Sequence, residues 1–241
     1  MAERTTAIEP ARTFWPTSQM SNFHVPIRFL NDLPAGWSLS RKQLADTSSV
    51  SATITLLDTY YTNFYDSHPF TLPKHYMIAH ISTAPNDVQF LISVFCYIGS
   101  LFEAGISSDE LRDSAFNQAC GPLPPTVYNV QGLLILALAA GGEGRKDLYN
   151  AWHDRAVQTA LDLGMQHRSF ADAEPDPVVG ESHRRTYWAL YLYDCWRAVS
   201  RQLPSFRLYN VPVTADIPCE EWEYQSGVSK TRCYISQHTS R

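Results

Sequence analysis

Apolar residues recur at three- and four-residue steps through most of the chain after residue 50, which is the spacing of one face of an α-helix. No segment shows a comparable alternation of apolar and polar residues, the pattern of a half-buried strand. Short connectors separate the periodic segments, which favours an all-α fold built as an array of antiparallel helical hairpins. The predicted helices lie at about 51–66, 88–103, 107–118, 126–140, 148–164 and 181–201.

The helix predicted at 126–140 is apolar around nearly its whole circumference, so we expect it at the centre of the domain, packed on several sides. Gly141 and Gly142 end it. Gly164 ends the following helix, because glycine accepts the left-handed conformation that is common just after a helix.

Three regions differ in composition. Residues 1–48 are rich in Pro, Ser and Thr and lack sustained periodicity, which indicates an irregular arm before a helical domain at 49–221. Residues 222–241 form a polar tail in which we expect no amphipathic helix. The helix at 181–201 would then lack a cover, so we expect a domain truncated at its C-terminus that leaves some apolar surface exposed.

The charge of the chain limits its partners. It has 241 residues and a formal net charge of −5, without the basic excess that lets a nucleic-acid-binding surface neutralise phosphates. Its five cysteines are widely spaced, which favours a reducing compartment, and no apolar run is long enough to span a bilayer. We therefore expect indirect contact with DNA at most and no association with membranes.

The last predicted helix has two distinct faces. We expect its apolar stripe to be buried, with Trp188 at the centre; the stripe consists of Trp188, Tyr191, Leu192, Cys195 and Val199. Asp194 lies on a different face among aromatic residues, where an unpaired carboxylate would be costly to bury. We expect an ion pair for it, either with Arg197 three residues later or with Arg184 or Arg185 from a neighbouring segment.

The sequence offers little for catalysis or metal binding. Its eight histidines include no H-E-x-x-H or zinc-finger spacing, and no Gly-rich phosphate loop or G-x-S-x-G motif is present. Asp194 lacks a second carboxylate or a Ser/His pair that would complete a mechanism. The sequence therefore predicts no catalytic, cofactor-binding or metal-binding residues, and a protein that is not an enzyme.

Two segments together resemble a known family. LYNAWHDRAVQTALDLGMQHR (148–168) and ESHRRTYWALYLYDCWRAVSRQLPSFRLYNVPVTADIP (181–218) are similar to the middle regulatory domain of fungal zinc-cluster transcription factors. That pattern runs from an A-x-x-L-G-L-H helix end through R-R-x-F-W and a helical Asp to a Pro-rich exit. The matching residues here are Arg184, Arg185, Trp188, Asp194 and Pro204.

The resemblance implies the regulatory domain of a fungal transcription factor, acting in the nucleus and controlling a metabolic or secondary-metabolite pathway. It implies partners among the proteins of the transcription machinery, or a homodimer partner, and it allows a small-molecule effector. Two alternatives remain open: a helical scaffold or adaptor that binds a partner protein, and a helical enzyme.

The chain departs from the family pattern in two places. The family's zinc cluster needs six closely spaced cysteines for two zinc ions, and here no two cysteines are close, so we expect no zinc cofactor and no zinc-cluster DNA-binding module in this chain. Where the family has Gly-Arg-Pro after the last helix, this chain has Gln202-Leu203-Pro204. It thereby lacks the glycine that eases the exit from the helix.

Overall fold

The computed structural model describes residues 47–227, and the regular elements in that range are helices. The prediction of an all-α fold is therefore confirmed. Nearly all of the arm predicted at 1–48, and residues 228–241 of the predicted tail, lie outside the described residues. The helices are α2 (Thr47–Asn63), η2 (Tyr65–Ser67), α3 (Lys74–Thr83), α4 (Gln89–Ser100), α5 (Asp109–Cys120), α6 (Val127–Gly142), α7 (Lys146–Leu163), α8 (Arg168–Asp172), α9 (Pro177–Ser200) and α10 (Glu221–Ser226).

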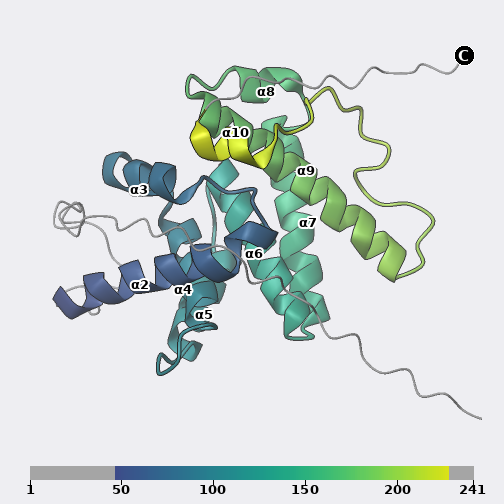
Figure 1. Ribbon diagram of the computed structural model, residues 1–241. Helices are drawn as coiled ribbons and strands as arrows, with labels where there is room; N and C mark the ends of the chain where they lie inside the picture. The colour runs from purple at the N-terminus through teal and green to yellow at the C-terminus, as the bar shows by residue number, and fades with distance from the viewer. Residues whose placement is uncertain (1–46, 228–241) are drawn as a thin grey trace, which may run out of the picture. The chain divides into compact units, whose positions relative to one another are not determined.

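Helices α4 and α6 form the middle of the array and pack against each other. Helices α2 and α5 pack on α4, whereas α7 and α9 pack on α6 (Figure 1). The three residues 143–145 join α6 to α7, a connection short enough to make the two helices a hairpin. None of the helices in the described range is both long and apolar enough to cross a bilayer.

Helix α6 has the central position that its sequence predicts, with buried residues from Val127 to Ala137 and at Ala140. Thr126 caps its N-terminus, where the Thr126 hydroxyl oxygen accepts a hydrogen bond from the Asn129 backbone N–H at 3.2 Å. Gly132 lets α4 approach closely, because a Cβ atom there would lie 2.6 Å from the ring of Phe90.

A left-handed residue follows both α7 and α9, but it is a glycine only after α7. Gly164 follows α7 with a φ of 82°, in the left-handed region, as its sequence predicts. Gln202 follows α9 with a φ of 55°, although it has a side chain. The chain therefore makes a left-handed exit from α9 without the glycine that would relieve its steric cost.

Helix α9 differs from its prediction in where it begins and in which face is buried. It begins at Pro177 rather than 181, and the carboxylate of Asp176 caps it by accepting a hydrogen bond from the Val178 N–H at 2.8 Å. The predicted stripe is only half-buried at Trp188, Tyr191 and Cys195, and Leu192 and Val199 are exposed. The face that enters the protein is a neighbouring one, formed by Tyr187, Leu190, Asp194 and Ala198.

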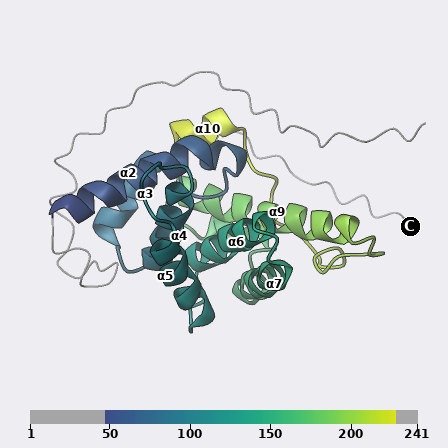
Figure 2. The same ribbon diagram turned by 90° about the horizontal axis from the view of Figure 1, so that it is seen from below.

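Three short helices were not expected from the sequence, namely α3, α8 and α10. The last of these corrects the prediction of a polar tail without an amphipathic helix at 222–241, because α10 lies at the start of that segment and buries Tyr224. Its Tyr224 is 1% exposed and donates a hydrogen bond from its hydroxyl to the Thr71 carbonyl at 3.0 Å. In Figures 1 and 2 α10 lies beside the first half of α9, and the side-chain amide of Gln225 donates a hydrogen bond to the Tyr65 hydroxyl of η2 at 3.2 Å.

The observed register of α9 can be tested with two leucines that are two residues apart. Leu190 is fully buried and Leu192 is 59% exposed. Leu190→Ala should lower the free energy of unfolding by about 2–5 kcal/mol, through lost transfer energy and a residual cavity, and Leu192→Ala by less than about 0.5 kcal/mol. Urea denaturation followed by circular dichroism measures both, and the reverse order would restore the register expected from the sequence.

Candidate functional site

The first half of α9 contains a buried ionic centre around Glu181, which is only 1% exposed. Its two carboxylate oxygens accept hydrogen bonds from two guanidinium groups, Arg184 Nε at 2.9 Å and Arg185 Nε at 3.2 Å. One of these oxygens also accepts the backbone N–H of Cys219 at 2.8 Å. The three charged residues are three and four positions apart, so a single helix face brings them together.

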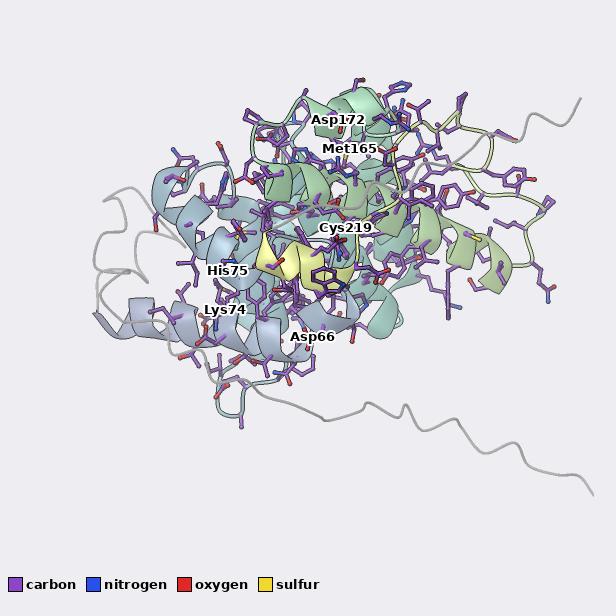
Figure 3. The ribbon with its side chains drawn as sticks, turned by 45° about the horizontal axis from the view of Figure 1, so that its top comes forward. Asp66, Lys74, His75, Met165, Asp172 and Cys219 are labelled. Carbon is purple, nitrogen blue, oxygen red and sulfur yellow. The ribbon has the colours of Figure 1, made fainter. Side chains whose placement is uncertain are left out.

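The two arginines connect this centre to different parts of the chain. Arg184 reaches Asp172 of α8 at 3.4 Å. Arg185 donates to the carbonyl oxygens of Pro69 at 3.0 Å and Cys219 at 2.8 Å, and it pairs with Glu221 of α10. Figure 3 shows Asp172 on α8 and Cys219 beside α10.

The ring of Tyr224 completes the surroundings of Arg185, whose guanidinium carbon lies 4.2 Å from the ring centroid. A cation over an aromatic face is stabilised by the negative potential of the ring, and burial strengthens the attraction. Arg185 therefore fastens α10 to α9 by an ion pair, a backbone hydrogen bond and a cation–π contact.

A neutral polar group joins α9 to the central helix next to this centre. The side-chain amide nitrogen of Gln131, on α6, lies 2.9 Å from the Ser182 hydroxyl and 2.8 Å from the Thr186 hydroxyl. It is also 3.2 Å from the carbonyl oxygen of Phe70. Gln131 is fully buried, so these contacts replace the water that its amide nitrogen loses on folding, whereas its amide oxygen is buried without a hydrogen-bond partner.

The second half of α9 contains a separate ionic centre around Asp194. Arg197 approaches the Asp194 carboxylate at 2.9 Å, which confirms the first of the two predicted partners. The other carboxylate oxygen accepts the Leu208 N–H at 2.9 Å, and Arg197 also pairs with Asp154 of α7 at 2.6 Å. Arg184 and Arg185 belong to the Glu181 centre and are not partners of Asp194.

The remaining two family-motif residues lie outside both centres. The indole N–H of Trp188 donates to the Asp216 carbonyl at 2.8 Å, and Trp188 is half-buried rather than central to a buried stripe. Pro204 is exposed in the loop after α9, which leads to the Leu208 backbone contact with Asp194. The five motif residues are thus distributed along α9 and its exit instead of converging on one site.

Two histidines, the buried His153 and the half-buried His183, have lowered pKa values. Burial lowers the pKa of His183 to about 4, and the neighbouring Arg184 guanidinium contributes in the same direction. Burial and the Arg197 guanidinium also lower the pKa of His153, against the opposing effect of the Asp194 and Asp154 carboxylates. Both imidazoles are therefore neutral in the folded protein at pH 7.

The arrangement suits a structural role for these charges. Both carboxylate oxygens of Glu181 and of Asp194 are occupied by guanidinium or backbone N–H donors, which leaves neither of these carboxylates free as a general base. Within residues 47–227, no group of three or more His, Cys, Asp or Glu side chains is placed to hold a metal ion. Sequence reasoning overlooked Glu181 and Gln131, although the spacing of Glu181 before Arg184 and Arg185 was a usable signal.

Comparisons with known proteins relate this chain to transcription factors. A family model described as "Fungal specific transcription factor domain" matches residues 57–237. Among curated proteins, the C6 finger domain transcription factor iacK of Pestalotiopsis fici is 29% identical over 183 residues. The match covers 74% of this chain and 27% of the relative, so the chain spans about a quarter of that protein. No solved structure gives a significant match.

The Glu181 centre can be tested by a substitution that keeps the charge. Arg185→Lys removes the planar group that reaches Glu181, Glu221 and two carbonyl oxygens at once, so it should lower the free energy of unfolding by up to about 3 kcal/mol. The control is Arg201→Lys, at an exposed arginine just after the same helix, with an expected change within about 0.5 kcal/mol. Equal denaturation midpoints for both variants would contradict the assigned role of Arg185.

The lowered pKa values of His153 and His183 predict how the free energy of unfolding depends on pH. In the unfolded chain these histidines take up protons near pH 6.5, whereas the folded protein resists protonation until the pH approaches about 4. The contribution of these histidines to the free energy of unfolding is therefore complete above about pH 6.5. It is lost as the pH falls below that value, by about 1.4 kcal/mol for each unit of difference between the folded and unfolded pKa. Urea titrations at several pH values should show this fall. His183→Asn should reduce it, and the exposed His167→Gln should not.

Proposed function

The chain belongs to the family of fungal-specific transcription factor domains, and from that premise we propose that it is a regulatory domain that modulates transcription through contacts with other proteins. The observation that carries the proposal is the family match over residues 57–237, about three quarters of the chain. We propose that the domain acts in the nucleus, in the control of a metabolic or secondary-metabolite pathway.

The charges of the domain support a role without direct reading of DNA. Arg184, Arg185 and Arg197 are all engaged by carboxylates of the same chain, so they are not free to neutralise phosphates. The net charge of −5 would add repulsion to any approach to a duplex. On this proposal, recognition of the target sequence comes from a zinc-cluster module other than these residues.

The buried polar centres support a role without catalysis. Enzymes need titratable groups that face a cleft and have free lone pairs or protons. Glu181 and Asp194 instead hold neighbouring segments of the chain in place. The proposed partners are proteins of the transcription machinery or a second copy of this chain, with a small-molecule effector as a further input.

A reporter assay combined with a DNA-binding titration tests the proposal. Fused to an unrelated DNA-binding domain and activation domain in a fungal host, the chain should change reporter output at equal nuclear abundance. The purified chain should bind duplex DNA only with the weak affinity of non-specific binding, with a dissociation constant above about 1 µM at physiological salt.

The matched control is the same fusion with Leu190→Ala, which weakens the fold without altering the exposed surface. An unchanged reporter with the parent chain would overturn the regulatory role. Sequence-selective DNA binding at nanomolar concentration would overturn the division between regulation and DNA reading.

A further inference from the structure

Two exposed arginines at the exit of α9, Arg201 and Arg207, have no carboxylate partner within residues 47–227. Another arginine, Arg155, donates to the carbonyl oxygens of Ala119 and Gly121 at the C-terminal end of α5, where the helix carries partial negative charge. The other arginines in that range form ion pairs with Asp or Glu, namely Arg112, Arg145, Arg168, Arg184, Arg185 and Arg197.

Both guanidinium groups are bound to neutral acceptors on α7. Arg201 donates to the side-chain oxygen of Asn150 at 2.5 Å. Arg207 donates to the backbone carbonyl of Asp154 at 3.2 Å and to the side-chain oxygen of Gln158. These three acceptors are four residues apart, so they lie on one face of α7. A guanidinium binds an anionic oxygen about twice as strongly as a neutral one, so this pair of cations favours an anion.

The acidic side chains nearest to the pair are engaged elsewhere. The carboxylate of Asp154 pairs with Arg197 at 2.6 Å, and that of Asp194 pairs with the same guanidinium at 2.9 Å. The carboxylate of Asp162 accepts a hydrogen bond from the Gln158 amide at 2.6 Å. Within the described residues, the anion that would complete the site is therefore not one of these side chains.

The segment between the two arginines is anchored at both ends. Just after α9, the Leu203 N–H donates to the Ala198 carbonyl at 2.9 Å. At the other end, the Leu208 N–H donates to the buried carboxylate of Asp194 at 2.9 Å. Figure 1 shows the chain after α9 turning back along that helix toward α10. Residues 204–207 are thus held near the end of α9, beside both guanidinium groups.

Ser205 lies in this segment, four residues after Arg201 and two before Arg207, and it is exposed. Two residues span at most about 7 Å of chain, so a group attached to the Ser205 hydroxyl is within reach of the Arg207 side chain. The hydroxyls of Ser200 and Thr214 are engaged, with the Arg197 carbonyl at 2.9 Å and the Arg168 N–H at 3.1 Å. The Ser205 hydroxyl has no such bond within the described residues and is available for modification.

We propose that Ser205 is a phosphorylation site and that Arg201 and Arg207 bind the phosphoryl group it receives. In the transfer, the Ser205 hydroxyl oxygen forms a bond to the γ-phosphorus of a nucleoside triphosphate. The bond between that phosphorus and the bridging oxygen breaks, the nucleoside diphosphate leaves, and the hydroxyl proton passes to a base of the protein kinase. The product carries a charge of about −1.5 to −2 at pH 7, which the two guanidinium groups match.

This modification would change the surface at the end of α9. Charge-assisted hydrogen bonds to the phosphate fasten residues 203–207 to the arginines that already hold α7, and they neutralise two exposed cations. The inference goes beyond the proposed function, because it assigns a covalent input to the domain, and neither of its tests depends on transcription.

Mass spectrometry tests whether Ser205 is modified. Trypsin cleaves after Arg201 and Arg207 and releases the peptide QLPSFR (202–207), in which Ser205 is the only hydroxyl-bearing residue. A phosphoryl group on that peptide is therefore assigned to Ser205 and separated from Ser200 and Tyr209. The full chain, isolated from a fungal host with phosphatases inhibited, should yield a phosphorylated fraction of this peptide. A peptide that is never modified would overturn the proposal.

A phosphorus NMR titration tests the role of the arginines, using the full chain with phosphoserine incorporated at position 205. Nearby guanidinium groups favour the dianion, so the second pKa of the phosphate should lie below about 6, its ordinary value. Arg207→Gln and Arg201→Gln should each raise that pKa by about 0.5–1. Arg112→Gln, which removes the same charge from α5, is the matched control and should leave it unchanged, with circular dichroism confirming folding. Equal phosphate pKa values in the parent and both exit variants would refute binding by these arginines.

Discussion

The described part of this protein depends on one carboxylate that is almost completely removed from water, that of Glu181. A buried charge is tolerated only when it is paired and its lone pairs are occupied, and here two guanidinium groups and a backbone N–H meet that requirement. Through Arg184 and Arg185 the same carboxylate is linked to α8, to the loop before α3 and to α10. Segments more than a hundred residues apart are thereby tied to one turn of α9.

This centre and the one around Asp194 explain how α9 can bury charged residues. Its inward side contains Glu181, Arg184, Arg185 and Asp194 beside the apolar Tyr187 and Leu190, whereas Leu192 and Trp196 are exposed. The inward charges are not left unpaired, since each is matched within the same helix or by a neighbouring segment. The apolar side chains of Leu192, Trp196 and Val199 are consequently left on the exposed side of the helix.

The order of helices was largely predictable from local pattern. Helices α4, α6 and α7 overlap the predicted segments, because their apolar residues recur with helical spacing and glycine or turn residues end them. The full burial of α6 followed from its apolar composition on every side. The short helices α3, α8 and α10 could not be predicted, because segments of five to ten residues contain too few periods and are stabilised mainly by tertiary contacts.

By itself the sequence determined the all-α class, the central position of α6 and the requirement of Asp194 for an arginine partner, because each follows from residues close together in the chain; the structure selected Arg197 among the three candidate arginines. Only the tertiary structure decided which face of α9 is buried and that Arg185 belongs to Glu181 and α10. Those choices depend on acceptors that are distant in sequence, such as the carbonyl groups of Pro69 and Cys219. Hydrophobic periodicity identifies an apolar stripe on a helix. It does not show whether polar partners from other segments lower the free energy of burying a different face of the same helix.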